Sequence, residues 1–438
     1  MSEITPSILI EVACLEGFQK QEQRSEVYQH VHAILEEREN IPIGTVFNIP
    51  VQYVRQVEVC TNVDQFTARS ALKFNFYILL DPDPVRETIN HGNEEVEISQ
   101  HWLLPSRELH GLWKSLIFEK EVKDSMLDFA ETSMLFARKG VDRNLVTCNR
   151  LALFHGPPGT GKTSLCKAIA QKLSIRLNDH YKHAHLMEIN SHSLFSRWFS
   201  ESGKLVQKVF REIVELLEDE DALVCVLVDE IESIAHSRDK ISSNEPSDSI
   251  RVVNAVLTQL DHLRRYSNVF ILATSNLTDN IDTAFLDRAD FIQYIGNPTE
   301  QAIYEIYRMA LHDLFNVGII TTDGTSTRKL SQSIGEQLPT HSEATDSSRA
   351  TSTSTVLDML LQVVKLSEGL SGRTLRKIPF LAHALYVKKD SESMPNFLSA
   401  MRQAIRKVLN DKALLSKRTL PAETVKGSVR ENHASLSV

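Results

Sequence analysis

Residues 7–81 carry short apolar runs, rich in β-branched and aromatic residues, that are separated by polar turns. The runs occupy residues 8–12, 46–51, 54–60 and 74–79. Between the first two runs, the apolar residues of 25–37 recur with the period of a helix. Short strands around one helix predict a small α+β domain, and no catalytic motif occurs in it.

A different pattern begins at Leu151, where short, almost purely apolar runs alternate with helical segments. These runs occupy residues 151–154, 186–189, 223–228 and 269–273, and a helical period precedes them at 118–138. Strands without a polar face indicate a sheet that is covered on both sides, which is typical of parallel sheets. We therefore expect an α/β nucleotide-binding fold here.

The last part of the chain is helical in period, over residues 299–316 and 356–414, which predicts a smaller all-α module. Between them, residues 321–355 contain 17 Ser or Thr in 35 residues and no apolar period, so we predict a disordered insertion. A linker is expected at 82–100, after a turn-forming Asp-Pro-Asp-Pro run. The predicted division of the chain is 1–100, 101–298, 299–415 and a disordered tail at 416–438.

Charge and composition narrow the class of protein. Lys and Arg number 48 against 57 Asp and Glu, so the net charge is −9, and no dense basic block occurs. Direct binding to nucleic acid or to an anionic membrane is therefore not expected. The five cysteines are far apart and form no Cys-x-x-Cys pair, which indicates neither a zinc site nor a disulfide framework and favours a reducing compartment.

The start of the chain lacks the basic and apolar regions of a signal peptide, and no run of about 18 apolar residues occurs. We expect an intracellular, soluble protein without a membrane segment.

The strongest chemical motif is a phosphate loop, G-x-x-x-x-G-K-[ST], between the apolar run at 151–154 and a helix predicted at 164–173. Its residues are Gly156, Pro157, Pro158, Gly159, Thr160, Gly161, Lys162 and Thr163, followed by Ser164. Backbone N–H groups of such a loop bind phosphate, the Lys162 ammonium reaches the β- and γ-phosphates, and the Thr163 hydroxyl can bind Mg²⁺. A chance glycine turn would not explain the strand and helix on either side.

Two carboxylates, Asp229 and Glu230, follow the apolar run at 223–228. Alone, such a pair is most often a helix cap and a surface charge. After a phosphate loop it predicts a hydrolytic site at the carboxyl edge of the sheet, with Asp229 in the Mg²⁺ shell and Glu230 polarising the attacking water.

Three more polar residues complete the predicted set. Asn276 follows the run at 269–273, where it can contact the γ-phosphate and the lytic water, although a turn-capping role is the alternative. Arg288 and Arg373 would each usually be solvated surface residues. With the phosphate loop, Arg288 is expected to act on the γ-phosphate of a neighbouring subunit, and Arg373 to sense the nucleotide from the all-α module.

The order of these motifs resembles that of AAA+ ATPases. Three stretches, at 188–204, 251–261 and 370–386, are more narrowly similar to the pachytene checkpoint protein 2 family, also called thyroid receptor-interacting protein 13. The similarity covers about residues 102–387, apart from the insertion. It implies an AAA+ fold with a parallel sheet between helices, a C-terminal helical lid and an N-terminal α+β domain that recognises substrate.

The resemblance also implies a function: an ATP- and Mg²⁺-dependent, usually hexameric ring that converts closed HORMA-domain proteins toward open forms. In that family the substrates are meiotic chromosome-axis proteins and a spindle-checkpoint protein, the latter presented by a HORMA-fold adaptor. Work in the nucleus, at chromosomes and kinetochores, and in the cytoplasm is implied as well.

The resemblance also implies a central-pore loop, which in this family threads the substrate. Its residues are Arg197, Trp198, Phe199, Ser200, Glu201, Ser202 and Gly203. Exposed aromatic side chains beside a glycine can grip an extended chain without reading its sequence. In isolation, Trp198 and Phe199 would more often be core residues.

Two other functions stay open on the motifs alone. A DNA-acting AAA+ motor shares the nucleotide motifs, but the net charge and the aromatic pore loop are unfavourable for it. A nucleotide-gated adaptor that seldom hydrolyses ATP is disfavoured by Glu230, Asn276 and Arg288. Only Arg288 stands where many AAA+ proteins carry two arginines.

Overall fold

The computed structural model describes residues 8–18, 21–38, 41–61, 71–91, 94–191, 202–232, 247–276, 281, 283–321 and 352–418. The chain divides into two compact units, which are described separately. One contains residues 1–302 and 369–373, and the other contains 303–368 and 374–438.

The N-terminal part of the first unit is a four-stranded sheet with one helix, which confirms the predicted α+β region. The strands are β1 (Ile8–Cys14), β2 (Val46–Phe47), β3 (Val54–Val59) and β4 (Leu72–Ile78), in the order β2-β3-β1-β4. Helix α1 (Gln21–Glu36) buries Val27, Val31 and Leu35, which are four residues apart and so share one face. This face packs in the apolar core of the sheet.

The rest of the first unit is built on a seven-stranded sheet in the order β11-β7-β10-β9-β8-β6-β5. Five neighbouring strands are parallel: β11 (Phe291–Tyr294), β7 (Leu151–His155), β10 (Val269–Ser275), β9 (Ala222–Asp229) and β8 (His183–Asn190). Consecutive side chains of the central strands enter different cores, because they point to opposite faces of the sheet. In β9, for example, Val226 belongs to one apolar cluster and Leu227 to the other.

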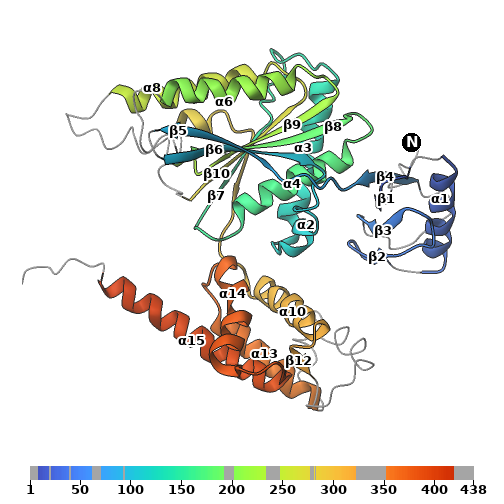
Figure 1. Cartoon of the computed structure of the whole chain (residues 1–438), viewed down its shortest axis with the longest axis vertical. Coiled ribbons are helices and arrows are strands. Elements are labelled where there is room, and N and C mark those ends of the chain that lie inside the picture. Colours follow the sequence, from blue (N-terminus) through green and yellow to red (C-terminus); the bar gives the residue numbers. More distant parts are fainter. Residues whose placement is uncertain are drawn as a thin grey trace, which may run out of the picture. The chain divides into compact units, whose positions relative to one another are not determined.

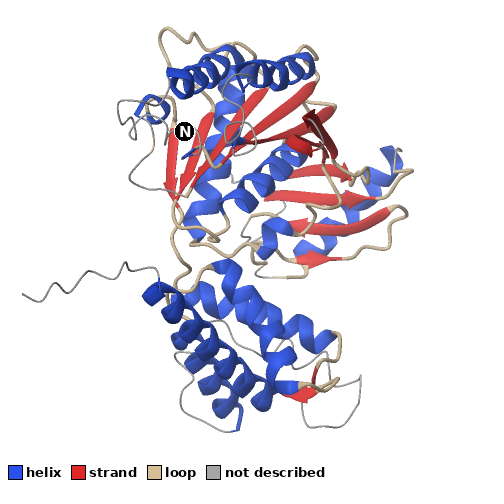
Figure 2. Cartoon of the chain, turned by 60° about the vertical axis from the view of Figure 1, so that its left-hand side comes forward, coloured by secondary structure: helices blue, strands red, loops and turns tan. Residues whose placement is uncertain are grey.

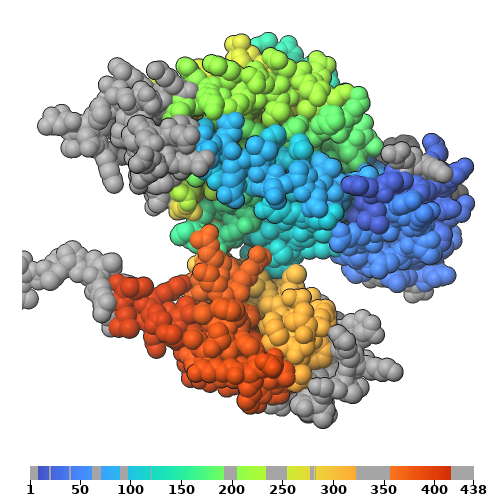
Figure 3. Space-filling model, in the orientation of Figure 1, coloured from blue at the N-terminus to red at the C-terminus, as the bar shows by residue number. Residues whose placement is uncertain are grey.

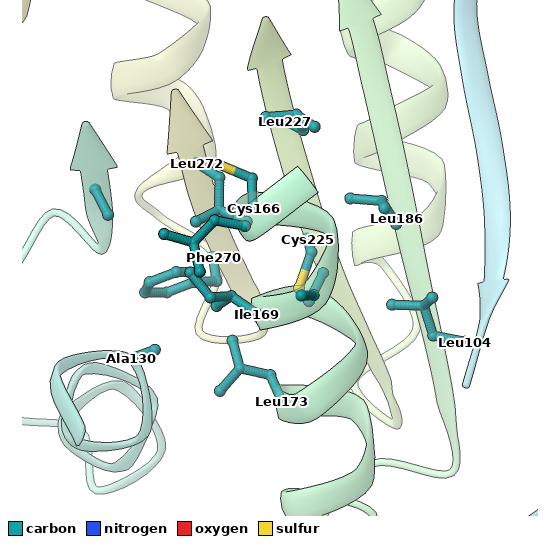
Figure 4. Packing of buried hydrophobic residues seen from close by; sticks show 14 of the residues in the cluster. Leu104, Ala130, Cys166, Ile169, Leu173, Leu186, Cys225, Leu227, Phe270 and Leu272 are labelled. Carbon is teal, nitrogen blue, oxygen red and sulfur yellow. The ribbon is translucent and has the colours of Figure 1, made fainter. Parts of the chain in front are cut away.

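Helices cover both faces of this sheet, which explains why its strands have no polar side. The first cluster contains residues of α6 (Ser202–Leu217) and α8 (Ser247–Leu263), and the second contains residues of α3 (Lys120–Arg138) and α4 (Lys162–Arg176). Figures 1 and 2 show the strands as a layer between these helices. In the second cluster, Ile169 and Leu173 of α4 lie against Phe270, Leu272 and Cys225 of the sheet (Figure 4). The unit also contains the short helices α2 (Leu112–Ser115) and α9 (Thr283–Leu286).

The prediction of a linker at 82–100 is wrong. This segment forms most of a β-hairpin, β5 (Val85–His91) and β6 (Glu94–Leu104), and β6 pairs antiparallel with β8. Antiparallel strands can have one apolar face and one face in water, so their polar composition can resemble that of a loop. As the outermost strand, β5 lies at the surface of the unit (Figure 3).

The second unit is helical, as predicted for the lid. It contains most of α10 (Glu300–Asn316), α13 (Ser352–Leu366), most of α14 (Gly372–Ala382), the π-helical turn η1 (His383–Val387) and α15 (Met394–Arg418). The short strands β12 (Ile320–Thr321) and β13 (Glu392–Ser393) pair in parallel. Buried Tyr307 of α10 and Ser367, which follows α13, share a hydrogen bond of 2.8 Å between their hydroxyl oxygens.

The edges of two predicted disordered segments are corrected. Thr321 lies in β12 and α13 begins at Ser352, so both ends of the predicted 321–355 insertion are ordered elements. Residues 322–351 lie outside the described residues. Helix α15 ends at Arg418, past the predicted start of the tail at 416, and residues 419–438 are outside the described part. The domain boundaries at 100, 298 and 415 stay predictions.

Among the described residues, no helix is both long enough and apolar enough to cross a membrane.

Candidate active site

The phosphate loop connects the end of β7 to the start of α4, at the carboxyl edge of the parallel sheet. Gly156 has a φ of 142°, and a Cβ atom there would lie 2.2 Å from the carbonyl oxygen of Ile295, so only glycine fits this position. Gly161 has a φ of 102° and directly precedes α4. The glycines therefore bend the loop tightly in front of a helix N-terminus, which is the geometry that binds phosphate.

Lys162 is the first residue of α4, and its side chain folds back over the loop. Its Nζ donates hydrogen bonds of 2.8 Å to the carbonyl oxygens of Gly156 and Pro157, and the residue is only 4% exposed. Burial lowers the pKa of Lys162, and the carboxylates of Glu232, Asp229 and Glu230 oppose this effect. An ammonium group on the inside of the loop suits the binding of a polyphosphate.

Other residues of the motif support the loop. The Thr160 hydroxyl donates a hydrogen bond of 3.0 Å to the carbonyl oxygen of Pro157. Pro158 is exposed, and Ser164 is half-buried in the first turn of α4.

Thr163 and Asp229 meet as the sequence predicts. The Thr163 hydroxyl donates a hydrogen bond of 2.8 Å to Asp229 Oδ1, which also accepts one from the hydroxyl of Thr274. A hydroxyl and a carboxylate at this spot are oxygen donors of the kind that Mg²⁺ prefers. The donor set therefore fits a magnesium ion beside the phosphate loop.

Glu230 and Asn276 lie on neighbouring strand ends, because β9 and β10 are adjacent and parallel. Asn276 Nδ2 donates a hydrogen bond of 3.2 Å to Glu230 Oε1. Glu230 has a φ of 56°, which is costly for a residue with a side chain, and its N–H donates to the Thr274 hydroxyl at 3.1 Å. A strained residue held by two polar contacts is typical of a functional site.

Thr274, which the sequence motifs did not indicate, links these two carboxylates. It is 1% exposed, accepts from the N–H of Glu230 and donates to Asp229. The available signal was a hydroxyl residue inside an apolar strand, two positions before Asn276.

A segment distant in sequence, residues 369–373, lies along the phosphate loop within the same unit. The N–H of Arg373 donates a hydrogen bond of 2.9 Å to the carbonyl oxygen of Gly159. A Cβ atom at Gly159 would lie 3.1 Å from the Ser371 hydroxyl and 3.3 Å from Arg373 Cβ. The structure thus places Arg373 next to the loop that it is predicted to sense.

Arg288 is held by a carboxylate of its own chain. Its guanidinium donates to both Asp261 oxygens, at 3.0 Å and 2.8 Å, and to the carbonyl oxygen of Ala284 at 2.6 Å. These hydrogen bonds lower the pKa of Asp261. A two-pronged pair with partial burial fixes the direction of the side chain. The predicted action of Arg288 on a neighbouring subunit stays a prediction.

A small apolar wall next to the loop was also missed. A Cβ atom at Gly161 would lie 3.3 Å from the Phe118 ring and 3.5 Å from a Leu116 methyl group. Such a wall suits the packing of a nucleotide base. Its only sequence signal is the apolar triplet 116–118 before α3.

The predicted pore loop is only partly covered. Residues 197–201, with Arg197, Trp198, Phe199, Ser200 and Glu201, lie outside the described residues. Ser202 and Gly203 open α6.

Comparison with known proteins agrees with this geometry. Residues 152–297 match the model of the "ATPase family associated with various cellular activities (AAA)", and residues 299–409 match the "TRIP13-like, AAA+ ATPase lid C-terminal domain". A pachytene checkpoint protein 2 homolog of Rattus norvegicus is 44% identical over 94% of this chain and 95% of its own length. The chain belongs to the pachytene checkpoint protein 2 family of AAA+ ATPases.

Further relatives support the same assignment. The Homo sapiens pachytene checkpoint protein 2 homolog is 48% identical over 78% of this chain and 77% of its own length. The solved structure of C. elegans PCH-2 matches with a TM-score of 0.74 and 33% identity, over 92% of this chain and 99% of that one. The predicted family and AAA+ fold are confirmed, and the chain is an ATP-hydrolysing enzyme.

Proposed function

We propose that this ATPase is a remodeller of HORMA-domain proteins, which it converts from closed to open forms as a homo-hexameric ring. The observation that carries the proposal is the meeting of Asp229, Glu230 and Asn276 at the phosphate loop, in a chain of this family. Such a site can turn over ATP repeatedly, and repeated cycles are what mechanical work on a folded protein requires.

Nucleotide binding is assigned to the loop from Gly156 to Ser164. Its backbone N–H groups and Lys162 would hold the phosphates, and Leu116 and Phe118 would pack near the base. Thr163 and Asp229 would hold a Mg²⁺ ion, which, when bound, offsets the negative charge of the phosphates.

Hydrolysis is assigned to the strand ends. Glu230 would orient and polarise the attacking water, and Asn276 would keep the Glu230 carboxylate in place through its amide. Arg288 of a neighbouring subunit would stabilise the charge that develops on the γ-phosphate. Arg373 lies beside the loop and would report the state of the nucleotide to the lid.

Substrate handling is assigned to two other regions. The N-terminal α+β domain would recognise a HORMA-domain substrate and its HORMA-fold adaptor. The pore loop, with Trp198 and Phe199, would grip the substrate chain. The name of the relatives, pachytene checkpoint protein 2 homolog, suggests a role in the meiotic checkpoint, and we extend the proposal to spindle-checkpoint signalling. We also propose work in the nucleus, at chromosomes and kinetochores, and in the cytoplasm.

The test is ATP turnover by the purified full-length protein, alone and with a closed HORMA-domain protein plus its adaptor. Ion-exchange elution follows the conformer of the substrate. We expect stimulated turnover together with conversion to the open form, and we expect Trp198→Ala to abolish conversion. Turnover without conversion would contradict the HORMA assignment and would favour another unfoldase or a DNA-acting motor.

A further inference from the structure

Glu232 is a buried carboxylate close to the hydrolytic site, and none of the roles assigned above includes it. It lies three residues after Asp229 and is 8% exposed. Its Oε1 accepts a hydrogen bond of 3.0 Å from the backbone N–H of Asn276. Its Oε2 has no hydrogen-bond partner within the described part of the chain. Burying a carboxylate is costly, so its presence calls for a physical reason.

One compensation for this cost is the nearby ammonium group of Lys162. Among the acids that offset the effect of burial on the pKa of Lys162, Glu232 contributes most, ahead of Asp229 and Glu230. The Glu232 carboxylate therefore interacts electrostatically with the ammonium group at the phosphate loop. It is nevertheless distinct from the two carboxylates assigned to Mg²⁺ and to water.

The second observation is a chain of hydrogen bonds through Asn276. Glu232 holds the backbone of Asn276 at 3.0 Å, and the side chain of Asn276 holds Glu230 at 3.2 Å. The peptide that joins Ser275 to Asn276 is held at both ends. Its carbonyl oxygen accepts a hydrogen bond of 3.2 Å from the N–H of Gly156, and its N–H donates to Glu232. Glu232 thus supplies one of the two hydrogen bonds that orient the peptide from which the Asn276 side chain reaches Glu230.

We propose that Glu232 is a positioning residue for ATP hydrolysis, which holds Asn276 so that the Asn276 amide keeps Glu230 directed at the attacking water. The proposal rests on ATP hydrolysis alone and is independent of the HORMA substrate. The alternative is a purely structural role, in which Glu232 accepts the hydrogen bond from the N–H that follows β10 and only stabilises the fold. The two roles differ in one measurable respect, because positioning must act through the Asn276 side chain and a structural role need not.

The experiment compares two variants of similar volume in the full-length protein. Glu232→Gln keeps an Oε1 acceptor for the Asn276 N–H, whereas Glu232→Met removes it. We expect Glu232→Met to lower kcat about tenfold or more with KM for ATP changed less than about threefold, and Glu232→Gln to recover most of this loss. Rates are expressed per nucleotide-binding site, so unfolded protein does not count as lost activity.

The decisive arm repeats Glu232→Met in an Asn276→Ala background. If Glu232 acts through the Asn276 amide, the substitution lowers kcat by less than about twofold there, since the effects of coupled residues are not additive. An equal loss of kcat in both backgrounds would overturn the proposal. So would a Glu232→Met variant that loses thermal stability but retains the wild-type kcat.

Discussion

Lys172 of α4 donates a hydrogen bond of 2.5 Å to Glu11 of β1, and this buried ion pair joins the phosphate-loop helix to the N-terminal sheet. The side chains of Lys172 and Glu11 are 8% and 1% exposed. Burial by itself lowers the pKa of Lys172, but Glu11 and other nearby groups raise it above its usual value. Lys172 is therefore charged at neutral pH. Its loss would leave Glu11 with only the longer ion pair to Arg176, whose Nε lies 3.8 Å from Glu11 Oε1.

We expect Lys172→Met to destabilise the protein by about 3 kcal/mol, because breaking a buried ion pair strands the remaining charge. Equilibrium urea unfolding at pH 7 measures the change. The double variant Glu11→Leu with Lys172→Met should recover part of the loss, since neither charge remains. Lys182→Met, at the exposed pair with Asp221, is the control and should lower the free energy of unfolding much less than Lys172→Met does. If Lys172→Met and Lys182→Met lowered the free energy of unfolding equally, burial of the Lys172–Glu11 pair would not be the cause of the loss.

The sequence was sufficient to predict the core of the site, because motifs at strand ends become neighbours in a parallel sheet. Lys162, Asp229 and Asn276 are brought together in this way by β7, β9 and β10. The central strands were predictable for a related reason, since helices on both faces leave them no polar side.

The missed features depend on pairings that no periodicity encodes. The β5–β6 hairpin lies at one end of the sheet and is polar along much of its length, so its sequence resembles that of a linker. Arg288 donates hydrogen bonds to Asp261, which is 27 residues away in the sequence, and Glu232 accepts one from the backbone of Asn276, which is 44 residues away. Such polar contacts are set by tertiary packing, which local patterns do not specify.

Thr274→Val is expected to lower kcat about tenfold or more without a large loss of stability. Valine has nearly the same shape, but it lacks the hydroxyl that binds Asp229 and the N–H of Glu230. The loss should fall on kcat rather than on nucleotide affinity, because the phosphate loop is untouched. Steady-state ATP hydrolysis and equilibrium nucleotide binding check this. Thr258→Val, on an exposed face of α8, is the matched control and should hydrolyse ATP at the normal rate.

Glu230→Gln should trap ATP without turnover. The amide retains the size of the side chain but cannot polarise water, so we expect kcat to fall by about 100-fold or more with ATP binding retained. Single-turnover phosphate release and nucleotide binding are the measurements. Hydrolysis near the wild-type rate would remove Glu230 from the hydrolytic role.

A pair of histidines should make the fold sensitive to acid. His101 Nε2 and His185 Nδ1 lie 2.9 Å apart on β6 and β8. Burial lowers the pKa of both histidines. The pKa of His185 falls to about 4, because burial and the neighbouring His101 and His183 lower it more than Asp219 raises it. Glu87 likewise opposes the effect of burial on the pKa of His101.

The sign of the effect follows from proton binding. Below about pH 6.5 the unfolded His185 takes up a proton, whereas the folded one stays neutral until about pH 4, so stability falls between these values. Between pH 7 and pH 5, we expect the free energy of unfolding to fall by about 2 kcal/mol less in His185→Gln than in the wild type. Urea unfolding at both pH values measures the difference. His312→Gln, at an exposed histidine of α10, should follow the wild-type pH dependence. Parallel curves for His185→Gln and wild type would contradict the prediction.

Arg288→Ala should lower ATP turnover by about 100-fold or more if its guanidinium stabilises the transferred phosphoryl group. The structure shows that Asp261 of the same chain fixes the direction of the Arg288 side chain.

Action across subunits makes a specific prediction for mixtures of two inactive variants. Lys162→Ala removes phosphate binding and Arg288→Ala removes the neighbour's cation, so a mixed ring contains some sites in which both groups are intact. We expect mixing to restore measurable turnover, whereas each variant alone stays inactive. Light scattering on each variant establishes that assembly is retained, and inactivity of the mixture despite assembly would place Arg288 outside the reaction of a neighbouring subunit.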